Sequence, residues 1–376
     1  METLPQDIIA NILSRLPVKF LIQLKCVCKP WRSLISDPQF AKLHLKQTQK
    51  NSNFSRYRVL LITEPLESIA CEASAEDLDD ESKLILELEY PSAMKKTPDS
   101  DDLVDGWLDL GGSCNGLICA VFEHERIFLW NPTIREAKEL ANLNAFDPKA
   151  SFSYGLGYDF LTDDYKVVRA ARPSTANASN ETEVEVLALK SNNWRRVQGL
   201  QSGTEIEGPG LFFHGTLHWL AARETGLKKI YVIVAFHMVE EKFYELVPVP
   251  DHVEESKDNT LVLGISGDCL CLFYGYDCEN VFEAWLLKEY GIKSSWSRLF
   301  SVHRDILHGY KYWENALCYT KTGKVLIDYD GRELVWYDPK EKTSKTFTPG
   351  NHWDWFQPAI YIESLVSPNC YGATNV

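Results

Sequence analysis

The side chains that could carry out chemistry are scattered along this chain of 376 residues. Its nine histidines form no cluster. Three pairs of its ten cysteines stand close together, namely Cys26/Cys28, Cys114/Cys119 and Cys269/Cys271. None of these pairs has the C-x-x-C spacing that zinc sites use, so the sequence predicts reduced and mostly buried thiols, no metal site and no other cofactor.

One acidic segment offers the densest group of possible acid or base side chains. Asp159, Asp163 and Asp164 are close in sequence, but they lack the spacing and the terminal glutamate of an EF-hand loop. A charged turn before a strand fits them better than a general acid pair. The chain also has no Gly-x-Ser-x-Gly elbow and no P-loop. We therefore predict no catalytic residue, and an enzyme is kept as an alternative.

The sequence divides into two predicted modules, which would position any binding or reactive residues. The first, residues 1–46, is predicted to form three or four helices, because a proline that has no N–H to lose opens each of them. These prolines are Pro5, Pro17, Pro30 and Pro38. Asp37, directly before the last of them, is a favourable N-cap.

The apolar residues of this helical module exceed one amphipathic stripe. Ile8, Ile12 and Leu16 crowd its first part, and the excess continues as far as Phe40. A unit of below roughly 50 residues buries too little surface to be stable alone. We therefore expect the surplus apolar face to bind another protein. The alternative is a small helical subdomain whose apolar residues only pack on the rest of the chain.

Three motifs of this module carry a resemblance to a known family. They are Leu4-Pro5-x-Asp7-Ile8-Ile9, Leu16-Pro17-Val18-Lys19 and Cys26-Val27-Cys28-Lys29-x-Trp31-Arg32-x-Leu34-Ile35, and they resemble the F-box of plant F-box proteins. The resemblance implies docking on the Skp-type adaptor of a cullin–RING ubiquitin ligase. A departure is Pro30, where the family usually has serine, and the first turn of a helix tolerates it. The residues predicted to contact the adaptor are Leu4, Pro5, Ile8, Ile9, Ile12, Leu13, Leu16, Pro17, Val18, Leu21, Val27, Trp31 and Leu34.

Net charge separates the helical module from the rest. Residues 1–50 have eight Lys/Arg and three Asp/Glu, a charge of +5, whereas the whole chain carries −14, which leaves −19 elsewhere. Residues 64–105, with 14 Asp/Glu and three Lys, are predicted to form a solvated loop; a steering surface for a basic partner is the alternative. The acidic body argues against nucleic-acid binding. With no membrane-spanning run and no signal-like segment, we expect the cytoplasm, the nucleus or both.

Beyond residue 50 the periodicity changes to alternating strands separated by turns. Trp285 follows Phe236 by 49 residues, and Trp336 follows Trp285 by 51. A unit that recurs at about 50 residues is typical of kelch-like propeller blades, which bury their faces against one another. We predict about six blades, near residues 57–92, 107–145, 152–200, 208–250, 258–303 and 314–348, with 361–366 as a strand that could close the ring. A β-sandwich is the alternative topology.

Motifs in this body resemble the F-box-associated, kelch-like domain of plant F-box proteins over residues 105–366. They include Gly112-Ser113-Cys114-Asn115-Gly116-Leu117-Ile118, Trp130-Asn131-Pro132-Thr133-x-Arg135 and Tyr154-Gly155-Leu156-Gly157-Tyr158-Asp159. The constitutive-expresser type is the most similar, and S-locus F-box proteins are more distant. That type implies a part in the turnover of plant immune receptors.

The predicted protein is thus mainly β with a small α N-terminal domain. Its predicted domains are an F-box at 1–46, a linker at 47–56, a kelch-like β-propeller at 57–366 and a C-terminal tail at 367–376. The predicted function is the substrate-recognition subunit of a Skp–cullin–F-box ubiquitin ligase. Such a subunit acts by proximity and needs no catalytic residue of its own.

Two aromatic segments of the body are predicted to lie in exposed loops and bind a protein substrate, because Tyr and Trp are enriched at binding hot spots. The predicted substrate-binding residues are Tyr310, Tyr312, Trp313, Trp353, Trp355 and Phe356. Packing against blade edges is the alternative for these residues. A receptor for glycans, which would use aromatic side chains in the same way, is an alternative for the function.

Overall fold

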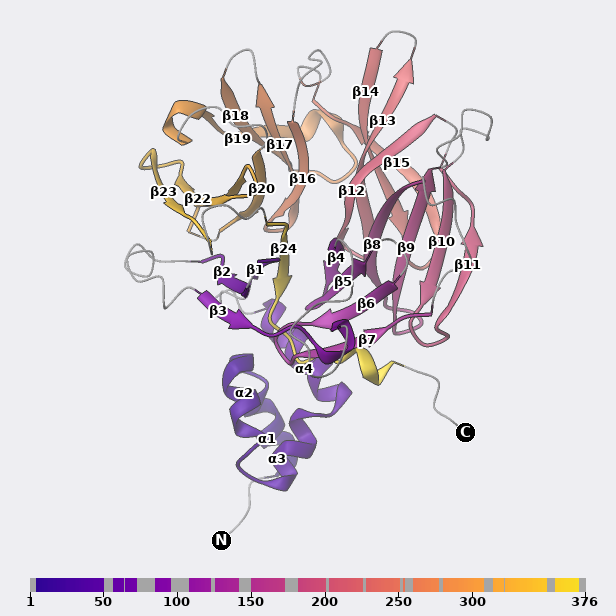
Figure 1. The fold of residues 1–376 in the computed structure, drawn as a ribbon, viewed down its shortest axis with the longest axis vertical. Helices are drawn as coiled ribbons and strands as arrows, with labels where there is room; N and C mark the ends of the chain where they lie inside the picture. Colours follow the sequence, from indigo (N-terminus) through magenta and orange to yellow (C-terminus); the bar gives the residue numbers. More distant parts are fainter. Residues whose placement is uncertain are drawn as a thin grey trace.

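The computed structural model describes residues 5–50, 57–63, 65–72, 85–95, 108–122, 126–141, 150–172, 182–200, 203–225, 228–250, 253, 260–276, 280–307, 314–320, 322–349 and 356–371. Four helices form one end of the molecule, and β-sheets arranged around a common centre form the rest (Figure 1). The chain therefore has the two modules that its periodicity predicts.

The helices begin where the prolines predict. They are α1 (Gln6–Leu13), α2 (Val18–Leu24), α3 (Lys29–Ile35) and α4 (Pro38–Lys50). The carboxylate of Asp37 accepts a hydrogen bond from the backbone N–H of Gln39 at 2.7 Å, which confirms the predicted cap of α4. Because α4 continues to Lys50, the first part of the segment predicted as a linker is helical.

Four of the sheets are antiparallel and have four strands each. The first consists of β24 (Pro358–Ile362), β1 (Tyr57–Leu61), β2 (Leu66–Ala70) and β3 (Ile85–Leu88). The second consists of β4 (Leu108–Cys114), β5 (Leu117–Phe122), β6 (Arg126–Asn131) and β7 (Glu136–Glu139). The other two are β16 (Thr260–Ser266), β17 (Cys269–Tyr276), β18 (Val281–Leu287) and β19 (Trp296–His303), and β20 (Glu314–Tyr319), β21 (Val325–Tyr329), β22 (Glu333–Asp338) and β23 (Thr343–Phe347).

The remaining eight strands share one sheet. In spatial order they are β11 (Asn193–Val197), β10 (Glu183–Ala188), β9 (Asp164–Arg172), β8 (Ser151–Asp159), β12 (Thr204–Phe213), β13 (Thr216–Thr225), β14 (Lys228–His237) and β15 (Lys242–Pro248). Two antiparallel four-stranded units meet where β8 and β12 run parallel and Gly155 pairs with Gly210. A Cβ atom would stand 2.6 Å from the Trp219 ring at Gly155 and 2.5 Å from it at Gly210, so glycine permits this close approach.

This joined sheet corrects the predicted count of about six separate blades. Hydrogen bonding among the described strands separates four four-stranded sheets, and the two further units are merged by the glycine contact. Periodicity reports strands and hairpins, but it does not report whether neighbouring units hydrogen-bond to one another.

The sheets close into a ring through their innermost strands. Strand β24 contacts β4, β4 contacts β8 and β12, β12 contacts β16, β16 contacts β20, and β20 contacts β24 again. The predicted β-propeller is thereby confirmed, and the β-sandwich alternative is wrong. The closing strand β24 pairs with β1 and ends at Ile362, earlier than predicted. After it, residues 363–371 pack against the propeller and the helices, so the described part of the predicted tail, 367–371, is docked there.

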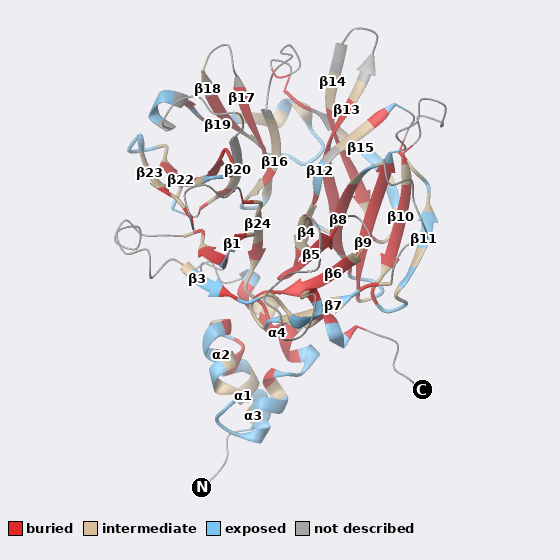
Figure 2. Cartoon of the chain, viewed as in Figure 1, coloured by how far each residue is buried: buried red, intermediate tan, exposed pale blue. Residues whose placement is uncertain are grey.

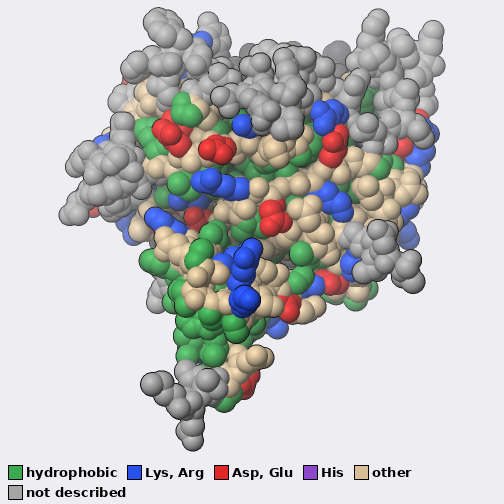
Figure 3. All heavy atoms as spheres, turned by 60° about the horizontal axis from the view of Figure 1, so that its bottom comes forward, with side chains coloured by type: hydrophobic (Ala, Val, Ile, Leu, Met, Phe, Trp, Pro, Cys, Tyr) green, Lys and Arg blue, Asp and Glu red, His purple; other side chains and the backbone are tan. Residues whose placement is uncertain are grey.

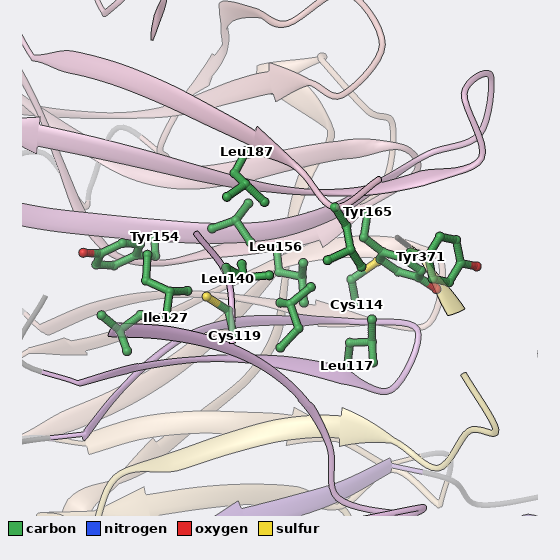
Figure 4. Packing of buried hydrophobic residues seen from close by; sticks show 14 of the residues in the cluster. Cys114, Leu117, Cys119, Ile127, Leu140, Tyr154, Leu156, Tyr165, Leu187 and Tyr371 are labelled. Carbon is green, nitrogen blue, oxygen red and sulfur yellow. The ribbon is translucent and has the colours of Figure 1, made fainter. Parts of the chain in front are cut away.

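The strands carry most of the buried residues (Figure 2). Apolar side chains from neighbouring sheets pack together in shared clusters. One cluster lies between the β4–β7 sheet and the β8–β11 unit and includes Cys114, Leu117, Leu156, Tyr165 and Tyr371 (Figure 4). Trp130 and Trp219, each 1% exposed, pack in two other clusters, as their predicted role between blades requires.

Candidate functional site

The helical end of the molecule exposes a group of apolar side chains. Ile8, Ile12, Phe20 and Val27 are 43%, 52%, 53% and 61% exposed. Hydrophobic side chains gather over this end in the view of Figure 3. The helical module is therefore not sealed against the propeller, and the alternative that its apolar residues serve only as packing is not supported.

Helical spacing explains which residues face outward. In α1, Ile9 and Leu13 are four residues apart and point into the core of the helical module, whereas Ile8 and Ile12 are also four apart and lie on the exposed face. In α2, Val18 and Leu21 are buried, and Phe20 lies on the opposite side. Each short helix thus has one face in the core and one in solvent.

Three of the residues predicted to contact the adaptor are corrected by this arrangement. Leu13, Val18 and Leu21 are only 2%, 2% and 0% exposed and form the core of the module. A side chain without exposed surface contacts no partner, so these residues shape the face and do not belong to it.

The other predicted contacts lie at the surface or close to it. Pro5, Ile8, Ile12 and Val27 are exposed; the half-buried ones are Ile9, Leu16, Pro17, Trp31 and Leu34. Leu4 lies outside the described residues. Adaptor contact by these residues stays a prediction, and we name the exposed set Ile8, Ile12, Phe20 and Val27 the apolar face.

Phe20 and Leu43 are exposed apolar residues that are not among the predicted adaptor contacts. Phe20 stands two residues after buried Val18, and a step of two residues turns to the far side of a helix. A helical wheel of α2 that has Val18 and Leu21 on the buried side places Phe20 on the exposed side.

The helical module also exposes basic side chains. They are Arg15, Lys19, Lys29, Arg32 and Lys46. A complementary partner surface would thus be apolar and carry acidic groups, because like charges facing each other would weaken association.

The core of the helical module is continuous with α4. His44 is 1% exposed, and its Nε2 lies 2.9 Å from the backbone oxygen of Leu16, which joins α4 to the turn between α1 and α2. Phe40 and Ala41 of α4 pack in the same core. The orientation of the apolar face is therefore tied to α4.

The predicted substrate-binding residues of the body are placed only in part. Phe356 is 1% exposed and packs in a cluster between β1 and β22, so its predicted contact with a substrate is corrected. Tyr310, Tyr312, Trp313, Trp353 and Trp355 lie outside the described residues, and their role stays a prediction.

The acidic segment after β8 is a turn whose carboxylates are paired. Lys166 is buried and donates to Asp159 Oδ2 at 2.6 Å and to the backbone oxygen of Met238 at 2.8 Å. Burial raises the pKa of Asp159, but hydrogen bonds from Lys166 and from backbone N–H groups outweigh it and leave the pKa lowered. Burial raises the pKa of Asp164, and its carboxylate accepts from the backbone N–H of Lys190. These contacts hold the turn together and leave no free acid–base pair in it.

A buried histidine is likewise structural. His218 is fully buried, and its Nε2 lies 2.6 Å from the hydroxyl of Tyr290, which belongs to the turn between β18 and β19. Burial lowers the pKa of His218 to about 4, so the ring is neutral near pH 7. It links two neighbouring sheets.

Within the described ranges, no group of three or more His, Cys, Asp or Glu side chains is arranged to hold a metal ion. None of the described helices has the length and apolar character needed to cross a membrane.

Comparisons with known proteins match both modules. The F-box domain family matches residues 1–43, and the F-box associated beta propeller domain family matches residues 89–366. The chain is similar to the F-box protein CPR1 of Arabidopsis thaliana, at 29% identity over 100% of this chain and 91% of that protein. It is also similar to an F-box/kelch-repeat protein of the same plant, at 30% identity over 80% of each.

The fold is also similar to a solved structure of oligogalacturonate lyase in complex with manganese, and the match covers 78% of this chain and 73% of the lyase chain. Its TM-score of 0.44 and its 8% identity are too low to indicate a function.

Proposed function

Because the chain belongs to the family of F-box proteins that carry an F-box-associated β-propeller domain, we propose that it is the substrate-recognition subunit of a Skp–cullin–F-box ubiquitin ligase. The helices bind the Skp-type adaptor and, through it, the cullin–RING core. The propeller holds a protein substrate. The chain itself is a non-catalytic adaptor, since it is enough to hold target lysines near a ubiquitin-charged enzyme.

The exposed apolar face is the observation that supports this proposal most. Burying one large aliphatic or aromatic side chain contributes about 1.5–3 kcal/mol. Ile8, Ile12, Phe20 and Val27 are all available for such burial. The exposed basic side chains of the helical module would add attraction to acidic groups on the adaptor.

The target class is the finer part of the proposal. A plant immune receptor is the target that the constitutive-expresser resemblance implies, and the cytoplasm or the nucleus is the proposed location. A glycan-binding receptor is the second possibility for the propeller. Removing the glycans from captured proteins separates the two, because a receptor of protein surfaces keeps its partners after that treatment.

A pull-down from plant extract tests the proposal. The wild-type chain should capture the Skp-type adaptor, a cullin and its target. A full-length variant with Ile8→Asp and Ile12→Asp should lose the adaptor and the cullin but retain the target, which would then escape ubiquitination. Retention of the adaptor by this variant would contradict the assigned face.

A further inference from the structure

We infer that the helical module is fixed to the propeller by a clasp, and that Lys42, Asp163 and Leu365 are positioning residues that set which lysines ubiquitin can reach. The clasp is defined as α4 together with residues 363–371 and the turn between β8 and β9. The inference rests on the proposed ligase function.

Each module contributes apolar side chains to the core of the other. Leu365, which follows the closing strand, is 6% exposed and packs in the core of the helical module. Ile134 of the β6–β7 turn packs against the same core. In the other direction, Leu45 of α4 packs against the cluster between the β4–β7 sheet and the β8–β11 unit. Turning the helices relative to the ring would expose these residues.

Residues 363–371 are in turn anchored to the second sheet. The Asn131 side chain donates to the backbone oxygens of Ser364 at 3.1 Å and Val366 at 2.7 Å. The hydroxyl of Ser367 donates to the carboxylate of Glu136. The Tyr371 ring meets the ring of Tyr165 edge-on, with centroids 5.1 Å apart, inside the cluster of Figure 4. The segment is therefore held at both of its ends.

A polar contact joins α4 to the propeller beside this segment. Lys42 Nζ donates to Asp163 Oδ2 at 2.5 Å and lies 5.8 Å from the centre of the Tyr371 ring. The hydroxyl of Tyr158 donates to the same carboxylate. Asp163 has a positive φ of 53°, a conformation in which Asp and Asn are tolerated better than most residues. One cation thus contacts both the β8–β9 turn and the end of the 363–371 segment.

A fixed junction matters for transfer by proximity. Tethering raises the effective concentration of a target lysine only where the geometry lets it reach the donor. With the helices clasped, the adaptor-bound enzyme and the propeller keep one relative orientation, so ubiquitin is transferred to a few lysines. A hinged junction would let ubiquitin reach a larger number of lysines.

The test uses the full chain in the assembled ligase and follows its self-ubiquitination, which needs no identified target. Lys42→Glu places a carboxylate against Asp163. Lys42→Glu with Asp163→Asn removes that repulsion and keeps a residue suited to positive φ. Arg126→Glu is the matched control, because the Arg126–Glu139 pair has side chains 32% and 39% exposed, against 28% and 42% for Lys42–Asp163, and lies away from the clasp.

Two readouts are needed: hydrogen exchange of residues 38–50 and 363–371, and the set of ubiquitin-bearing lysines mapped by mass spectrometry. We expect Lys42→Glu to speed exchange in both segments by about fivefold or more, the scale of one surface ion pair, and to spread ubiquitin over more lysines. The double variant should restore both in part, because it removes the repulsion without rebuilding the ion pair, and Arg126→Glu should change neither. Adaptor affinity should stay the same in all variants.

An unchanged lysine map in Lys42→Glu despite faster exchange would overturn the positioning role, and unchanged exchange would overturn the clasp. If Lys42→Glu fails to fold, Lys42→Met should show the same changes to a smaller degree. A wild-type chain that does not bind the adaptor would instead overturn the proposed function, and this inference with it.

Discussion

The helical module exposes large apolar side chains at a higher density along its sequence than the propeller does. Among the described residues, 13 large hydrophobic side chains are exposed, and five of them belong to the small helical module: Ile8, Ile12, Phe20, Val27 and Leu43. The propeller instead buries residues as large as Trp130 and Trp219 between its sheets. The ring satisfies its own apolar surface by closing on itself, whereas four short helices have no layer left to cover their outer face.

This difference explains why the helical module is expected to need a partner that covers its apolar side chains, whereas the propeller covers most of its own by packing between its sheets. Strand β24 pairs with β1 and so joins the last part of the propeller to the first. This pairing covers the edge of β1, and the remaining edges belong to the outermost strand of each sheet. The predictions below test whether the exposed and the buried apolar residues separate into binding and stability, from the largest expected effect to the smallest.

Charged residues on the apolar face should have the largest effect. In the chain with Ile8→Asp and Ile12→Asp, adaptor affinity should fall by at least about 100-fold, because burial of two aliphatic side chains is lost and carboxylates replace them. Isothermal titration calorimetry measures this.

The propeller supplies the matched control for that variant. Ile292 and Ile306, 45% and 40% exposed, lie in the propeller outside the clasp. The chain with Ile292→Asp and Ile306→Asp should bind the adaptor as the wild type does. Equal losses in both variants would mean that exposure alone, and not the helical face, determines binding.

Neighbouring positions in α2 should separate stability from binding. Leu21→Ala should lower the free energy of unfolding of the helical module by about 2–5 kcal/mol, since Leu21 is fully buried. Phe20→Ala should leave stability within about 0.5 kcal/mol and weaken adaptor binding. Urea unfolding and calorimetry on both variants measure the two quantities. Similar stability losses for the two variants would contradict the two-faced helix.

The spacing of residues along the helices determines how much of the apolar face can be predicted from the sequence. The prolines place the helix starts, and the four-residue spacing pairs Ile8 with Ile12 and Ile9 with Leu13. Which pair faces inward depends on contacts with α4 and with Leu365, more than 300 residues away in sequence. Sequence spacing alone does not supply those contacts, so it does not distinguish buried Leu13, Val18 and Leu21 from the other predicted adaptor contacts.

The same limit applies to the propeller. Alternating strands and recurrent tryptophans predict a ring of sheets, but the merging of two units depends on Gly155 meeting Gly210 across the fold. Phe356 shows that the sequence also does not reveal the long-range contacts of a single residue. Its loop-like sequence gives no sign that it fills a cluster between two sheets.

A side chain added at the contact between Gly155 and Gly210 should destabilise the propeller and leave the helices unaffected. Gly210→Ala places a Cβ atom 2.5 Å from the Trp219 ring, and such overpacking typically costs about 1–3 kcal/mol. The cost should shrink in a Trp219→Phe background, where the contacting part of the ring is absent. A double-mutant cycle of unfolding free energies measures this, and full additivity would argue against the contact.

The smallest effect should be a pH dependence at the clasp. Burial raises the pKa of Asp163, but hydrogen bonds from Lys42 and Tyr158 outweigh it and leave the pKa below its usual 3.8. An ionised Asp163 therefore stabilises the fold above pH 3.8, and this contribution is lost as the pH falls through the lowered pKa. Because the pair is partly exposed, we expect at most about 1 kcal/mol.

Comparison with Asp163→Asn isolates this contribution. Wild type should be more stable than the variant at pH 7, and the difference should shrink as the pH falls below 3.8 and vanish once the pH is below the lowered pKa. Thermal unfolding over that pH range measures it. A difference that persists at the lowest pH would mean that charge at Asp163 is not its cause.

Hydrogen exchange of the full chain, with and without a plant Skp-type adaptor, tests the central claim most directly. We predict that the adaptor slows exchange in residues 6–35, which carry Ile8, Ile12, Phe20 and Val27, and leaves the strands of the propeller unchanged. Protection that appears on the propeller, or no protection at saturating adaptor, would contradict the claim that the helical module leaves its apolar face open for a partner.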